Sequence, residues 1–135
     1  MSLLKIGVAT MVALVGLMAA SGDGRAQPTQ PVVITVQLSD YKFTPAEIDL
    51  DHGQTYVLRL VNSGTKAHDL SAKAFFQTVT LAPGSAAAVQ DGAVELAMGE
   101  SADVSFTTGA PGSYEMHCTH PLHAMLGMKG RIVVR

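Results

Sequence analysis

Side chains that bind soft metal ions gather in residues 118–128, close to the C-terminus of this 135-residue chain. The segment contains one thiol, two imidazoles and two thioethers, which belong to Cys118, His120, His123, Met125 and Met128. Thiolate and thioether groups select copper(I), and imidazole binds copper in either oxidation state. Zinc sites rarely use methionine, and structural zinc sites usually take four cysteine or histidine ligands. The donor types therefore predict a copper site.

A loop of this length can wrap one ion with Cys118 at its start, His123 in its middle and Met128 at its end. A trigonal site with two histidines and one cysteine needs a second imidazole from elsewhere in the chain. We expect His68 to supply it, because His68 follows a predicted strand and a turn that can reach the same end of the fold. The sequence thus predicts one copper ion per chain, held by His68, Cys118, His123 and Met128.

The remaining donors leave two alternatives open. A shifted register that uses His120 and Met125 has the same internal spacing, but only one residue separates Cys118 from His120. That leaves little chain to bring both side chains onto one ion, so this register is the weaker one. His117 and His120 flank the thiol, and a second, weaker copper site near the surface is the other alternative. We otherwise expect His117 and His52 to face solvent.

Residues 1–26 have the pattern of a secretory signal peptide. Lys5 precedes an apolar run over residues 6–20, and Gly24 and Ala26 are small residues at the two positions that a signal peptidase reads. The run is shorter than the roughly 20 apolar residues that span a bilayer. We expect cleavage after Ala26, with the region of residues 19–20 as the second choice and an uncleaved anchor as the alternative. The mature protein is then one domain, residues 27–135, periplasmic or otherwise extracytoplasmic, without stable membrane insertion.

The charge and the cysteine content of residues 27–135 exclude several classes of protein. Seven basic and ten acidic residues give a net charge of about −3, and no basic stripe is present that could bind nucleic acid. Cys118 is the one cysteine, so an internal disulfide is excluded, and the thiol is a buried hydrophobe, a reactive group or a metal ligand. No Ser/His/Asp set or pair of carboxylates suggests an enzyme.

Short segments rich in β-forming residues alternate with turn residues along the mature chain. In residues 113–118, every second residue up to Cys118 is expected to face inward. Residues 75–92 give mixed signals and are expected to form an excursion with a short helix. The pattern predicts an all-β, Greek-key sandwich, in which the last strand pairs with the strand before Cys118. The expected strands are residues 32–38, 47–50, 55–61, 94–96, 102–107, 113–118 and 130–134.

Taken together, these motifs resemble the cupredoxin (blue copper) family over nearly all of the mature chain. The resemblance rests on Asn62-Ser63-Gly64, His68-Asp69-Leu70, Pro111-Gly112-Ser113-Tyr114 and Cys118-x4-His123-x4-Met128-x-Gly130. It implies a Greek-key β-sandwich in which the two histidines and the cysteine form the equatorial plane and the methionine is a long axial ligand. In this family the residue after the first histidine is often Asn, which bridges the two ligand loops. Here it is Asp69, which when ionised can only accept hydrogen bonds, for example from the Thr119 hydroxyl or a backbone N–H.

The resemblance implies an exported monomer that transfers single electrons between redox proteins and is not an enzyme. Partner proteins are expected to dock near His123, where an apolar rim would be formed by Leu122, Ala124, Met125 and Leu126. The alternative is a copper-handling protein that uses the same ligands for scavenging, delivery or copper resistance.

Overall fold

In the computed structural model, residues 22, 24 and 30–135 are described. The predicted signal peptide and its cleavage site lie outside the described residues except for Gly22 and Gly24, which are single isolated positions. Among the described residues, no helix is long and apolar enough to cross a membrane.

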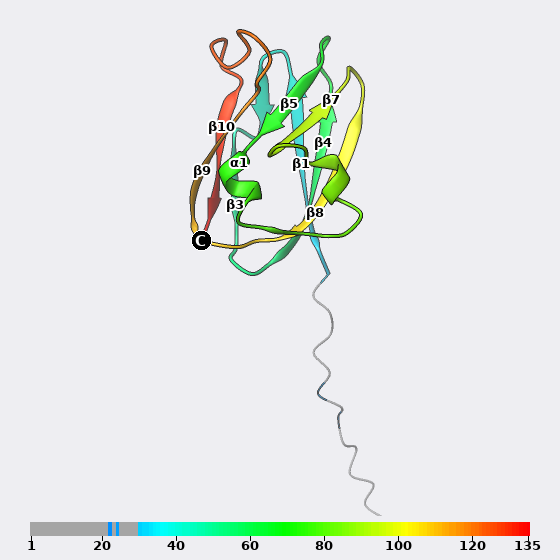
Figure 1. The fold of residues 1–135 in the computed structure, drawn as a ribbon, viewed down its shortest axis with the longest axis vertical. Coiled ribbons are helices and arrows are strands. Elements are labelled where there is room, and N and C mark those ends of the chain that lie inside the picture. Colours follow the sequence, from blue (N-terminus) through cyan, green and yellow to red (C-terminus); the bar gives the residue numbers. More distant parts are fainter. Residues whose placement is uncertain (1–21, 23, 25–29) are drawn as a thin grey trace, which may run out of the picture.

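Two five-stranded sheets pack face to face (Figure 1). The first sheet has the strand order β2-β1-β4-β8-β6, and the second has the order β3-β10-β9-β5-β7. In chain order, the strands are β1 (Val32–Ser39), β2 (Lys42–Thr44), β3 (Glu47–Leu50), β4 (Thr55–Asn62), β5 (His68–Ser71), β6 (Thr80–Leu81), β7 (Ala93–Leu96), β8 (Ser101–Thr107), β9 (Gly112–His117) and β10 (Lys129–Val134). The predicted all-β sandwich is confirmed.

Alternating apolar residues of the strands make the core between the two sheets. In β9, Met116 is buried while Glu115 and His117 are exposed, and Cys118 continues the buried face just beyond the strand, as the sequence predicts. The excursion is also as predicted, because residues 75–92 include the end of a short helix, α1 (Lys73–Phe76), and a 3-10 turn over Ala86–Ala88. Phe75 anchors this excursion in the core and packs edge-on against Phe106.

The strand pairing differs from the prediction in two places. Strand β10 pairs antiparallel with β9, as expected, but it also pairs in parallel with β3, and β1 pairs in parallel with β4. The parallel pairs arise because the chain leaves the first sheet after β2, adds β3 to the second sheet, and returns to the first as β4 beside β1. Strands β2, β5 and β6 were not predicted. Strands β2 and β6 have only three and two residues, and β5 is mostly polar although all four of its residues are buried.

Gly130 has no side chain because the β3–β10 pairing leaves no room for one. A Cβ atom on Gly130 would lie 2.0 Å from the backbone oxygen of Ala46 and 2.8 Å from the Met116 methyl group. The same Ala46 oxygen accepts the hydrogen bond from the Arg131 amide at 2.9 Å. The glycine that ends the metal-donor motif therefore allows β10 to lie close to the chain that leads into β3.

We expect Gly130→Ala to destabilise the protein by about 1–3 kcal/mol, because a backbone carbonyl cannot move aside without breaking the β3–β10 pairing. Gly84→Ala is the matched control, since a Cβ atom there meets nothing within 4 Å. Urea unfolding of the two variants measures the difference. Equal midpoints for both would show that the close approach at Gly130 has no energetic consequence.

Candidate metal centre

The turn after β4 positions His68, and the buried side chain of Asn62 holds this turn together. Its amide nitrogen donates to the carbonyl groups of Lys66, Leu96 and Ala97 at 2.8–3.1 Å, and its oxygen accepts from the Gly64 amide at 3.0 Å. Both the nitrogen and the oxygen of this side chain are thus hydrogen bonded to the backbone, in the turn, at the end of β7 and at the residue after it. As a result, the chain re-enters the second sheet at His68, whose side chain is completely buried.

The loop between β9 and β10 carries the other candidate ligands, and two backbone hydrogen bonds close it. The Cys118 amide donates to the Met128 carbonyl at 3.1 Å, and the Met128 amide donates to the His123 carbonyl at 3.0 Å. The loop lies at the opposite end of the sandwich from the C-terminus (Figure 1). Cys118, His123 and Met128 are therefore fixed relative to one another by the backbone of the loop itself.

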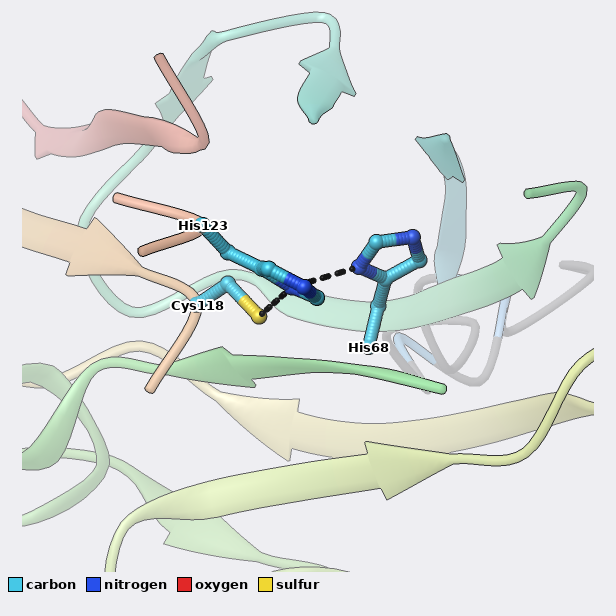
Figure 2. A group of neighbouring side chains, drawn as sticks. All are labelled: His68, Cys118 and His123. Atoms are coloured by element: carbon cyan, nitrogen blue, oxygen red, sulfur yellow. Dashed lines mark hydrogen bonds between the residues drawn. The ribbon is translucent and has the colours of Figure 1, made fainter. Parts of the chain in front are cut away.

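The structure brings the two stretches together, and Figure 2 shows the His123 ring between the Cys118 sulfur and the His68 ring. The His123 Nδ1 atom lies 3.3 Å from Cys118 Sγ and 3.2 Å from His68 Nδ1. All three donor atoms fall within 4.8 Å of one another, and all three residues are buried. Donors from residues 68, 118 and 123 thus converge as a single ion requires.

The loop separates its remaining donors. Met128 is fully buried at the base of the loop, whereas the Met125 side chain is exposed and Met116 belongs to the hydrophobic core. Of the two thioethers in the loop, Met128 is therefore the one on the buried side. This arrangement matches the preferred register, with His123 and Met128, rather than the shifted one.

Asp69 links β5 directly to the ligand loop. Its carboxylate accepts a hydrogen bond from the Thr119 amide at 2.6 Å and a second from the Thr119 hydroxyl. Asp69 is buried, and Thr119 directly follows Cys118. The bridge that the resemblance assigns to Asn is thus made here by an aspartate, which accepts both bonds.

Asp40 is a residue of the site that the sequence did not reveal. Its Oδ1 atom lies 2.6 Å from His68 Nε2, on the side of the ring that faces away from His123. Hydrogen bonds from the Thr65 hydroxyl, from His68 and from the Thr65 amide hold the pKa of Asp40 well below its usual value, so the carboxylate is ionised at neutral pH. Asp40 is 28 residues before His68 and follows a different strand, and no local motif marks it.

Burial favours the uncharged forms of the Cys118 thiol and the His123 ring, so a metal that binds here would displace the thiol proton. Burial raises the pKa of the Cys118 thiol to about 11, although backbone hydrogen bonds from Asp69 and His120 act in the opposite direction. Burial also lowers the pKa of His123, with smaller contributions from His68 and His120, so its imidazole is neutral and has a lone pair to offer. A thiol, two imidazoles and a buried thioether make a donor set that favours copper over zinc or magnesium.

The structure does not bring His117 and His120 together into a second metal-donor cluster. Among the described residues, His120 groups instead with Asp69 and Glu95, and its Nε2 atom lies 2.7 Å from a Glu95 oxygen. The His120 ring also stacks on the His123 ring, with centroids 5.4 Å apart. His117 and His52 are exposed, as predicted. Neither group of three or more donors found among the described residues contains both His117 and His120.

His123 lies beneath the surface of a loop that also carries three exposed apolar side chains. Its ring packs edge-on against Tyr41, with centroids 4.8 Å apart, and 8% of the residue is exposed. Leu122, Met125 and Leu126 have exposed fractions of 64%, 83% and 58%. These three residues form the apolar rim of the loop.

Comparison with solved structures supports the same fold. Auracyanin from Roseiflexus castenholzii superposes with a TM-score of 0.56 at 23% sequence identity, covering 77% of this chain and 97% of that one. Auracyanin A of Chloroflexus aurantiacus, described as a blue copper protein, gives a TM-score of 0.53 at 27% identity, covering 78% of this chain and 99% of that one. A multicopper oxidase from Campylobacter jejuni also matches, with a TM-score of 0.61 at 10% identity, over 82% of this chain but 31% of the oxidase.

Two sequence comparisons identify the family. The copper-resistant cuproprotein CopI of Rubrivivax gelatinosus is 32% identical over 118 residues, which are 83% of this chain and 71% of that protein. The sequence model of the cupredoxin-like domain matches residues 8–134. Together with the two-sheet fold and the converging His, Cys and His donors, this match shows that the chain belongs to the cupredoxin-like domain family.

Proposed function

We propose that this protein holds one copper ion with His68, Cys118, His123 and Met128 and transfers single electrons between redox proteins outside the cytoplasm. The observation that carries the proposal is the convergence of three buried donors from distant parts of the chain, with their donor atoms within 4.8 Å of one another. An export signal in residues 1–26 would deliver the protein to that compartment.

Copper bound here would supply a one-electron couple between its two oxidation states. The protein fixes the positions of the donor side chains. Asp40 and His123 contact opposite edges of the buried His68 ring, and Asp69 secures the loop through Thr119. Side chains that are fixed in this way do not need to rearrange when the charge of the site changes, and this favours fast electron exchange.

The apolar rim gives the proposal a docking surface. Leu122, Met125 and Leu126 are exposed on the loop that carries His123. A partner protein that covers this rim would exclude water above the least buried of the donor side chains. Weak electron-transfer complexes need only small interfaces, which suits a patch of three side chains. In this proposal the protein acts as a monomer and has no substrate, since four ligands leave no open position for one.

Copper handling is the second candidate function, and the similarity to CopI favours it. That relative is described as copper-resistant, and the match covers most of both chains. The same four ligands would then serve to store or deliver copper. Of the surplus donors, Met116 is in the core and His120 is hydrogen bonded to Glu95, whereas His117 and Met125 are exposed.

Metal counting and spectroscopy test the proposed site. We expect the wild-type protein to bind one copper(II) and to show an intense visible band from the Cys118 thiolate, together with an electron paramagnetic resonance spectrum of a single species. Cys118→Ser should abolish the visible band, because the charge-transfer donor is lost. Since Cys118 is buried among well-packed residues, near-ultraviolet circular dichroism of the copper-free variant controls for folding. A folded Cys118→Ser variant that keeps the band would contradict the site.

Repeated redox cycling in the presence of a copper(I) chelator separates the two functions. An electron carrier should keep its single copper through many cycles of reduction and oxidation. A delivery protein should lose copper to the chelator after the first reduction, and the absorption band should not return on oxidation. The retained copper per chain, counted after each cycle, decides between them.

Replacement of Asp69 tests the electrostatics of the site. Asp69→Asn removes a buried negative charge next to the ligand loop while an amide can still bridge to Thr119, so the oxidised ion loses more stabilisation than the reduced one. We expect the reduction potential to rise by about 60 mV for each tenfold change in the ratio of the copper(II) and copper(I) affinities. Voltammetry of the two proteins measures the shift, and an unchanged or lower potential would refute this role of the charge.

A further inference from the structure

We propose that Asp40 is a positioning residue of the metal centre: it fixes the His68 ring through Nε2 and makes the site favour the oxidised ion. This inference rests on the proposed copper site, but it concerns a residue outside the ligand set. The pair joins the two sheets of the sandwich, since Asp40 follows β1 of the first sheet and His68 begins β5 of the second.

The hydrogen bond to Asp40 determines which nitrogen of His68 faces the metal. The Asp40 oxygen lies 2.6 Å from His68 Nε2, and a carboxylate at this distance is an acceptor, so Nε2 carries the proton. In a neutral ring, the lone pair is then on Nδ1, the atom that lies 3.2 Å from His123 Nδ1 and within the donor cluster. The His68 ring is therefore already in the tautomer that a metal ligand requires, even in the metal-free protein.

Asp40 is itself held in place, which distinguishes it from a surface charge that happens to be near. The Thr65 amide donates to its two oxygens at 3.1 and 3.0 Å, and the Thr65 hydroxyl donates as well. The neighbouring Gly64 completes the arrangement, because a Cβ atom there would lie 2.5 Å from the Asp40 oxygen and 2.8 Å from His68 Nε2. The glycine of the Asn62 turn thus makes room for the carboxylate to meet the ring.

An ionised carboxylate on the far side of a ligating imidazole raises the basicity of the ligand and orients its ring, and losing such a partner typically weakens metal binding 10–100-fold. A more basic ligand stabilises copper(II) more than copper(I). The hydrogen bonds from the Thr65 amide and hydroxyl spread the negative charge of Asp40, so Thr65 moderates the effect of Asp40 on His68. Asp40 and Thr65 therefore have opposite influences on the same ring.

The test compares Asp40→Asn, Asp40→Ala and Thr65→Val in the full protein. In Asp40→Asn, the amide oxygen can still accept the hydrogen bond from His68 Nε2, but the negative charge is gone. We expect the copper(II) affinity to fall about tenfold more than the copper(I) affinity. This difference corresponds to a reduction potential higher by about 59 mV. Asp40→Ala should raise it further. Thr65→Val removes one donor from the carboxylate and should lower the potential.

A second measurement does not depend on bound copper. In the copper-free protein, nitrogen-15 NMR should show His68 protonated at Nε2, with a proton that exchanges slowly because the ring is buried and hydrogen bonded. Asp40→Ala should lose this slow exchange, while Asp40→Asn should keep it. This readout still reports on the pair if one of the copper-loaded variants is too unstable to study.

Asp49→Asn is the matched control, because it also removes one negative charge but its partner is Arg135 at the opposite end of the sandwich (Figure 1). The inference is overturned if the Asp40 variants have the same potential as Asp49→Asn. It is also overturned if the Nε2 proton of His68 still exchanges slowly in Asp40→Ala. A Thr65→Val potential that shifts in the same direction as Asp40→Asn would likewise overturn it. If wild-type protein instead fails to bind copper or shows no thiolate band, the proposed function fails, while the NMR result for the copper-free pair still stands on its own.

Discussion

The metal centre depends on a connection between two stretches of chain that the sheet hydrogen bonds alone barely join. Strands β5 and β9 are neighbours in the second sheet, but their ladder has a single register pair, Ser71 with His117. Nearer the site, the Asp69 carboxylate connects the two stretches with its two hydrogen bonds to Thr119. Because Asp69 and Thr119 are immediate neighbours of His68 and Cys118, this side-chain bridge sets the separation of the donors more directly than the backbone does.

The two imidazoles of the centre have different surroundings, which suit them to different roles. His68 is fully buried and is held by Asp40, so its ring belongs to the rigid interior of the fold. His123 lies on the loop with the exposed apolar rim, and the rings of Tyr41 and His120 pack against it. A ring buried and hydrogen bonded to a carboxylate suits retention of the metal, and a ring just below an apolar surface suits communication with a partner.

The sequence predicts the ligand loop well because its donors are close together and of unusual chemical types. The donors in residues 118–128 can be recognised from the sequence without knowledge of the fold. The turn at Asn62 was enough to select His68 from the histidines outside the loop. By contrast, β5 was missed because His68–Ser71 is short and mostly polar yet completely buried, a combination that no alternating pattern signals. The parallel pairs of β1 with β4 and of β3 with β10 could not be read from strand patterns either, since both sheets would show the same alternation in an antiparallel arrangement.

Asp40 and Asp69 also have a consequence for the choice between electron transfer and copper handling. They approach the centre from different elements and act on different groups, one on the His68 ring and the other on the backbone beside Cys118. Both place negative charge near the same ion, so both favour the oxidised state of copper. In the proposed site, reduction would weaken the electrostatic hold on the metal, and retention of copper(I) would depend on the Cys118 and Met128 sulfur atoms. The balance between these soft donors and the two carboxylates therefore decides whether a reduced site passes on its electron or gives up its metal.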